Sequence, residues 1–312
     1  MNKLLLAALV SSAIAIPAYA ADYTIMAPAS PGGGWDQTAR SMQQALTEEG
    51  ISGNVQVTNV PGAGGTIGLA QFATQENGNP NALIVGGYVM VGAILTNMSP
   101  VTLENVTPIA RLIGESDVIV VPANSELQTM DDLVAKLKAD PGAVAWAGGS
   151  AGGVDHIAAG LIAKAVGVDP TQVNYIAYSG GGEALAAVLG GQVTVGISGY
   201  GEFESQIAAG ELRALAVTGA DEVDGIPTLK ESNVDVNVEN WRMVAAAPGI
   251  TDEQKAAITA DIEKMASSDT WKSIMETNGW QDMYMSGADF DAQLAKDIES
   301  TTAVLKDIGL VQ

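Results

Sequence analysis

The chain has 312 residues, and its 36 Asp and Glu against 14 Lys and Arg give a formal net charge of −22 at pH 7. So acidic a surface argues against a nucleic-acid partner, because nucleic-acid binding depends on neutralising phosphates with Lys and Arg. The sequence has no cysteine and one histidine, which excludes cysteine-based redox chemistry and argues against a zinc site, so we expect neither metal nor cofactor.

The first twenty residues have the pattern of a secretory signal peptide. Lys3 supplies a positive charge, residues 4–16 are apolar or small, and Ala18-Tyr19-Ala20 fits the small-x-small cleavage rule. The apolar run is shorter than the roughly 20 residues that a membrane-spanning helix needs. We therefore expect cleavage of residues 1–20 and a periplasmic mature protein, with an uncleaved anchor as the alternative.

After this segment, short apolar runs alternate with helical patterns, which is typical of an α/β protein with a largely parallel sheet. Strands are expected at residues 24–27, 55–60, 82–86, 118–121, 143–147, 174–177, 193–198, 212–217 and 243–247. Three helical segments follow, near residues 252–266, 270–277 and 288–307.

The length that remains after cleavage suits two domains better than one. We expect a discontinuous first domain of residues 21–121 and 243–312, and a second domain of residues 122–242. The chain would cross between them through strands, with Pro122 and Pro248 as hinge candidates.

Four glycine-rich turns each stand between an apolar run and a helical pattern. In chain order they are Pro31-Gly32-Gly33-Gly34, Pro61-Gly62-Ala63-Gly64-Gly65, residues 148–153, and Ser179-Gly180-Gly181-Gly182. A helix N-terminus presents unpaired backbone N–H groups and about half a positive charge, and glycine lets a ligand approach closely. A carboxylate or phosphate can therefore bind there without an arginine. We expect a shared anion site, although each turn alone could be a tight connection without a ligand.

Three catalytic or nucleotide-binding motifs are incomplete. Gly148-Gly149-Ser150-Ala151-Gly152 matches a nucleophile elbow, but the single histidine, His156, lies in the adjoining helix and not later in the fold. Ile67 occupies the third glycine position of a dinucleotide-binding fingerprint, and no glycine turn is followed by Lys-Ser or Lys-Thr. These observations disfavour a hydrolase or a nucleotide-binding enzyme.

Ordered motifs run along nearly all of the chain after residue 20. They are Ala27-Pro28 with Pro31-Gly32-Gly33-x-x-Asp36-x-x-Ala39-Arg40, Asn59-x-Pro61-Gly62-Ala63-Gly64-Gly65-x-Ile67-Gly68, Gly148-x-Ser150-x-Gly152-x-x-x-His156, Tyr178-x-Gly180-x-Gly182-Glu183-Ala184, Leu189-Gly190-Gly191-Gln192-Val193, Ala209-Gly210-Glu211-Leu212-Arg213 and Ile226-Pro227-Thr228-Leu229-x-Glu231. In this order they resemble the receptors of tripartite tricarboxylate transporters, also called Bug proteins.

The resemblance implies an α/β, two-domain periplasmic binding protein of the type II, clam-shell kind, with a ligand cleft between the domains. It implies that backbone amides and waters from the first turn of each domain hold one ligand carboxylate. The positions carried over are Pro31, Gly32, Gly33, Gly34, Trp35 and Asp36 on one side, and Gly149, Ser150, Ala151, Gly152 and Gly153 with Ser179, Gly180, Gly181 and Gly182 on the other. The implied partner is a membrane permease of one large and one small subunit, driven by an ion gradient.

Several candidate side chains have a structural alternative. Trp35 stands in the first turn, where it would close over the ligand or pack on a neighbouring loop. Asp36 and Arg40 are four residues apart, a spacing that also gives a surface ion pair worth a few tenths of a kcal/mol. His156 follows Asp155 at the start of a helix, where it would face the ligand or form a structural hydrogen bond.

Three further residues complete the candidate site. Tyr88 and Tyr178 follow predicted strands, from which a hydroxyl would reach the cleft. Glu183 lies at the start of a helix, where an acid is stabilising, yet it would repel a ligand carboxylate. If Glu183 faces the site, we expect the ligand to offer it a hydroxyl or an ammonium group.

Together these features predict a monomeric, non-enzymatic receptor for a small carboxylate, either a tricarboxylate such as citrate or a C4 dicarboxylate. Ligand binding would shift the population from open to closed domains. An exported α/β enzyme acting on carboxylates and a periplasmic sensor subunit are the alternative functions.

Overall fold

The computed structural model describes residues 21–312, so the expected signal peptide lies outside the described residues. The strands are β1 (Ala21–Ala27), β2 (Ser52–Asn59), β3 (Ala82–Gly87), β4 (Thr107–Pro122), β5 (Ala145–Gly148), β6 (Asn174–Ala177), β7 (Val195–Gly199), β8 (Leu212–Val217), β9 (Glu239–Ala246) and β10 (Gln281–Ser286). The α-helices are α1 (Gly34–Glu48), α2 (Thr66–Gln75), α3 (Tyr88–Thr96), α4 (Met130–Ala139), α5 (Val154–Ala165), α6 (Gly181–Leu189), α7 (Tyr200–Ala208), α8 (Asp252–Ser267), α9 (Asp269–Asn278) and α10 (Gly287–Asp307).

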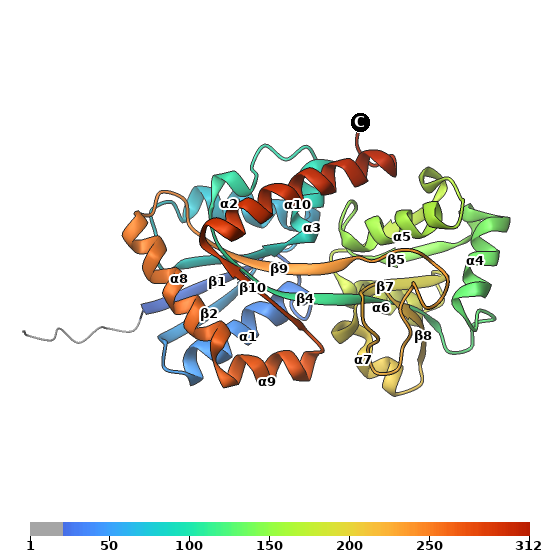
Figure 1. Ribbon diagram of the computed structural model, residues 1–312, viewed down its shortest axis with the longest axis horizontal. Coiled ribbons are helices and arrows are strands. Elements are labelled where there is room, and N and C mark those ends of the chain that lie inside the picture. Colours follow the sequence, from blue (N-terminus) through green and yellow to red (C-terminus); the bar gives the residue numbers. More distant parts are fainter. Residues whose placement is uncertain (1–20) are drawn as a thin grey trace, which may run out of the picture.

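The strands form two sheet halves that share β4. Along the sheet the order is β2-β1-β3-β9-β4-β7-β5-β6, and β8 and β10 also pair with β4. Residues 107–116 of β4 pair with β9, whereas residues 117–120 pair with β7. Figure 1 shows β4 and β9 running between a lobe that contains β1–β3 and a lobe that contains β5–β8.

The sheet is mixed, and so the expectation of a largely parallel sheet was wrong. β1 is parallel to β2 and β3, and β5 is parallel to β6 and β7. All the pairings made by β4 and β9 are antiparallel. The parallel part of each lobe follows from its strand–helix–strand connections, whereas the antiparallel part joins the two lobes.

The ends of several elements differ from the predicted ones. β4 begins eleven residues before its predicted start at 118, and β10 was not predicted at all. Charged side chains such as Arg111, Glu115 and Asp117 interrupt the apolar pattern in the first part of β4, although they are buried there. β10 has the polar sequence QDMYMS and therefore lacks a strand signal. The three C-terminal helices lie within two residues of their predicted bounds.

Each lobe has a buried core of its own. The first core includes Phe72 and Trp271, and the second includes Trp146. α10 covers the first lobe, but Leu305 and Ile308 at its C-terminal end pack against Ile157 of α5 in the second lobe. We propose that the domain crossings lie within β4 and β9, at about residues 116–117 and 239–240, and not at Pro122 and Pro248.

The helices begin in two different ways. Thr129 and Thr251 accept hydrogen bonds from backbone N–H groups at the starts of α4 and α8, and each completes a capping box. α1, α5 and α6 begin instead after Gly33, Gly153 and Gly180, which provide no side-chain cap. The first N–H groups of these three helices therefore receive no hydrogen bond from an N-cap side chain.

Candidate functional site

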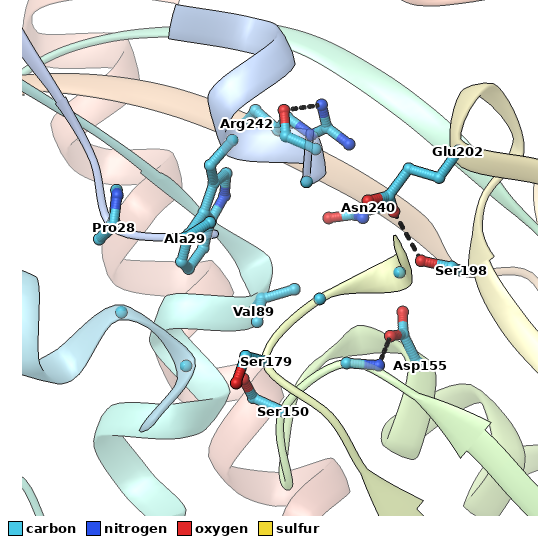
Figure 2. Close-up of a pocket in the computed structure, with 18 of the residues that line it drawn as sticks. Pro28, Ala29, Val89, Ser150, Asp155, Ser179, Ser198, Glu202, Asn240 and Arg242 are labelled. Atoms are coloured by element: carbon cyan, nitrogen blue, oxygen red, sulfur yellow. Dashed lines mark hydrogen bonds between the residues drawn. The ribbon is translucent and has the colours of Figure 1, made fainter. Parts of the chain in front are cut away.

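A cavity of about 70 Å³ lies between the two lobes, beyond the carboxyl ends of the parallel strands (Figure 2). Its lining residues follow β1, β2, β3, β5 and β6, or belong to the turns, β7, α7 and β9 near these ends. They are Pro28, Ala29, Gly33, Gly34, Trp35, Gly62, Gly64, Gly65, Val89, Gly149, Ser150, Asp155, Ser179, Gly180, Gly181, Ser198, Glu202, Asn240 and Arg242. All four glycine-rich turns therefore reach one cavity, in the position where open α/β sheets bind ligands.

Trp35 forms part of one wall, and its ring packs on the second glycine turn. Gly65 has a left-handed φ of 84°, and a Cβ at this position would lie 2.6 Å from Cζ3 of Trp35. Glycine is required on both counts, because other residues avoid this φ and would collide with the indole. Trp35 thus packs on a neighbouring loop, which is one of the two roles considered for it, and it also lines the cavity.

Arg242 is the basic residue of the cavity. Its guanidinium forms an ion pair with Glu115, and both side chains are almost completely buried. Nη1 also donates to the carbonyl oxygen of Gly34 at 2.6 Å and to Oγ1 of Thr38 at 2.8 Å. The guanidinium lies 5.6 Å from the ring centroid of Trp280. These contacts fix Arg242 beneath the first turn of α1.

Carboxyl groups gather on the second-lobe side. Glu202 accepts a hydrogen bond from Oγ of Ser198 at 2.6 Å, and burial together with the charge of Glu115 raises the pKa of Glu202 to about 7. Asp155 accepts from the backbone N–H of Gly149, and burial raises the pKa of this carboxyl. Asp117 is fully buried, and burial and the neighbouring Asp155 raise its pKa. Within residues 21–312 no group of His, Asp and Glu is arranged to hold a metal ion.

The structure brings about half of the predicted site residues onto this cavity. Those that line it are Gly33, Gly34, Trp35, Gly149, Ser150, Ser179, Gly180 and Gly181, and those that do not are Pro31, Gly32, Asp36, Tyr88, Ala151, Gly152, His156, Tyr178 and Glu183. Tyr178, Ala151 and Glu183 line a separate hollow beside it, together with Ser150 and Ser179.

Asp36 holds the first turn together. Its carboxylate accepts from the N–H of Gly32 at 2.8 Å, from Nδ2 of Asn59 at 2.9 Å and from Nε of Arg40 at 2.9 Å. Only 4% of the Asp36 side chain is exposed, compared with 53% of Arg40, so the pair is not the simple surface ion pair considered above. Asp36 therefore fixes the turn that presents Gly33 and Gly34.

Three other predicted site residues that do not line the cavity also make structural contacts. Tyr88 stacks on Trp241, with ring centroids 6.2 Å apart and 11° between the planes. Glu183 accepts from the N–H of Ser179 at 3.0 Å, which shapes the turn before α6. His156 stacks on Tyr175 at 4.1 Å, and its Nδ1 accepts from the N–H of Gly152 at 3.2 Å.

His156 is expected to remain uncharged until the solution is strongly acidic. Burial lowers its pKa from the ordinary 6.5 to about 4. Because this folded-state pKa lies below the unfolded one, His156 should destabilise the protein progressively as the pH falls from about 6.5 to 4. The chain has one histidine, so NMR titration of a single imidazole measures this directly. A midpoint near 6.5 would contradict the buried stack.

Sequence reasoning missed five polar residues of the cavity, namely Asp155, Ser198, Glu202, Asn240 and Arg242. A weak signal exists for two of them, since Ser198 and Glu202 stand four residues apart where a buried strand gives way to a helix. Arg242 and Asn240 lie inside β9. Only their location in the folded protein distinguishes them from strand residues that have no contact with the cavity.

Residues 38–310 match the family described as "Tripartite tricarboxylate transporter family receptor". The chain belongs to this family. It is 29% identical to Protein BugT of Bordetella pertussis over 234 residues, which cover 73% of this chain and 71% of that protein. The family is one of solute-binding receptors and not of enzymes.

Solved structures similar to this receptor show the same fold. R. palustris Rpa4515 with adipate has a TM-score of 0.81 at 21% identity, covering 92% of this chain and 97% of that one. MatC from Rhodopseudomonas palustris, with bound malate, has a TM-score of 0.80 at 19% identity, with coverage of 93% and 100%. The expected periplasmic-binding-protein fold is thereby confirmed. In the part of the chain that the structure describes, no helix has the length and apolar character needed to cross a membrane.

Proposed function

We propose that this receptor binds a small carboxylate in the cavity between its lobes and delivers it to a permease. The observation that carries the proposal is the convergence of the uncapped starts of α1 and α6 on one cavity, with Gly149 and Ser150 before α5 beside them. Backbone N–H groups at helix N-termini are suited to a carboxylate. The similar proteins with adipate and malate support this ligand class.

Binding is proposed to close the two lobes. The lobes already touch beside the cavity, where Oγ1 of Thr96 in α3 lies 3.2 Å from the carbonyl oxygen of Ala151. A Cβ added to Gly92 would lie only 1.9 Å from the carbonyl oxygen of Gly152, which shows how closely α3 approaches the turn before α5. A ligand that bridges both lobes would favour this closed arrangement over an open one.

The family and the N-terminal sequence support a proposal for the cellular setting. Tripartite tricarboxylate transporters imply a membrane permease, which we propose consists of one large and one small subunit. Residues 1–20 have the signal-peptide pattern, so we propose that the mature receptor is periplasmic.

A thermal-shift series tests the carboxylate proposal. The protein from residue 21 onwards is unfolded, dialysed and refolded to remove carried-over ligand, and is then heated with mono-, di- and tricarboxylates. A ligand at a hundredfold excess over its dissociation constant should stabilise the folded state by about 2.7 kcal/mol. Uncharged sugars and inorganic sulfate serve as controls. No shift with any carboxylate, for correctly refolded protein, would refute the proposal.

A further inference from the structure

We propose that the ligand carries a protonated amine beside its carboxylate and that Glu202 binds this amine, so that the substrate class is a small amino acid. This inference rests on the proposed carboxylate-binding function and narrows it. Its basis is the position of Glu202, its free oxygen, and the balance of charge around the cavity.

Glu202 reaches into the cavity from the first turn of α7, and Figure 2 shows its carboxyl group directed towards Asn240. Oε2 accepts from Ser198, whereas Oε1 is shielded from solvent and has no hydrogen-bond partner within residues 21–312. A Cβ at Gly33 would lie 3.9 Å from Oε1, and a Cβ at Gly181 would lie 2.5 Å from Oε2. The carboxyl group is therefore situated between the starts of α1 and α6.

A buried carboxyl oxygen without a partner is costly, because it has lost water and gained no donor. A ligand that offers a donor at this point would remove the cost. The carboxylate of the same ligand would then lie against the glycine turns at the helix starts, within the same small cavity. This arrangement calls for a donor and a carboxylate close together on one small molecule.

The charge balance favours a positively charged donor. In the described part of the chain, Arg242 is the only basic residue that lines the cavity, and its guanidinium is already paired with Glu115. Glu202 and Asp155 also line the cavity, and Asp117 lies behind Asn240. Within the described residues Glu202 forms no ion pair of its own, although it feels the charge of Arg242. A second ligand carboxylate would worsen this imbalance, whereas an ammonium group corrects it.

The proposal predicts that protons are released on ligand binding and not taken up, and this can be measured. The charged groups that face Glu202 are Glu115 on β4, Asp155 on α5 and Arg242 on β9, and burial with the charge of Glu115 raises the pKa of Glu202 to about 7. An ammonium group would stabilise the ionised form, so binding at pH 7 should release about half a proton per ligand. A second carboxylate facing Glu202 would instead cause proton uptake.

Isothermal titration calorimetry of the ligand-free protein tests this with two sets of matched probes. These are L-alanine, L-lactate and propionate, and L-aspartate, L-malate and succinate, which differ within each set only in an amine, a hydroxyl or a hydrogen. We expect the amino acid of one set to bind at least about tenfold more tightly than its two analogues. Titration in buffers of different ionisation enthalpy counts the protons released by the wild-type protein, which needs no variant.

Glu202→Gln should weaken amino-acid binding by at least about tenfold and abolish proton release. Glu204→Gln, at an exposed position on the same helix, should change neither. Tighter binding of the hydroxy or unsubstituted acid, or proton uptake, would overturn the amine assignment and leave the carboxylate receptor intact. Binding of no carboxylate in the wider thermal-shift panel would overturn both.

Discussion

Replacement of Arg242 by methionine is expected to lower the free energy of unfolding by about 3–5 kcal/mol. Arg242 and Glu115 are buried together, with side-chain exposures of 2% and 1%. Loss of the guanidinium would leave the Glu115 carboxylate buried without its counter-charge, which is far more costly than the net value of the pair. The carbonyl oxygen of Gly34 and Oγ1 of Thr38 would lose their donor as well.

Urea unfolding followed by circular dichroism measures this loss. Arg242→Met combined with Glu115→Gln should recover much of the stability, because no uncompensated charge then remains in the interior. The exposed ion pair of Lys136 and Glu126 provides a matched control, and Lys136→Met should cost less than about 1 kcal/mol. A loss below 1 kcal/mol for Arg242→Met would contradict this prediction.

Substitution of Gly92 by alanine is expected to weaken ligand binding by about 10- to 100-fold. The added methyl group would meet the carbonyl oxygen of Gly152 across the cleft, and overpacking of this kind costs about 1–3 kcal/mol. Gly92 lies within α3, where alanine favours the helix itself. The cost therefore falls on closure of the lobes and not on the fold of the first lobe.

Two measurements distinguish an effect on lobe closure from an effect on the fold, namely the affinity from calorimetry and the compactness of the protein from small-angle scattering. The wild-type protein should contract on binding, whereas Gly92→Ala should bind weakly and contract less. Gly142→Ala is the control, because Gly142 is exposed and distant from the cavity, a Cβ there makes only an ordinary contact 3.5 Å from Oδ1 of Asp140, and its φ is not in the left-handed region. An unchanged affinity for Gly92→Ala would refute the proposed closed arrangement, provided that unfolding curves show both variants to be folded.

The sequence alone determined the features that depend on neighbouring residues. The glycine turns were recognisable because Gly65 must adopt a left-handed φ and because helices that follow Gly33 and Gly180 lack a capping side chain. The three C-terminal helices were also visible from their local pattern. Together with the order of its motifs, these local signals were sufficient to predict the family and the fold.

Only the tertiary structure decided which polar side chains face the cavity. Arg242 pairs with Glu115 across 127 residues of sequence, and Arg111 pairs with Asp297 across 186. Before such partners are known, a buried charge in a strand resembles an exposed one, and so the first part of β4 was missed. Glu202 and Glu183 are both acids in the first turn of a helix. Glu183 binds the N–H of Ser179 in its own turn, whereas Glu202 reaches the cavity, because α7 begins directly after β7 and its first turn therefore lies at the edge of the sheet where the cavity is.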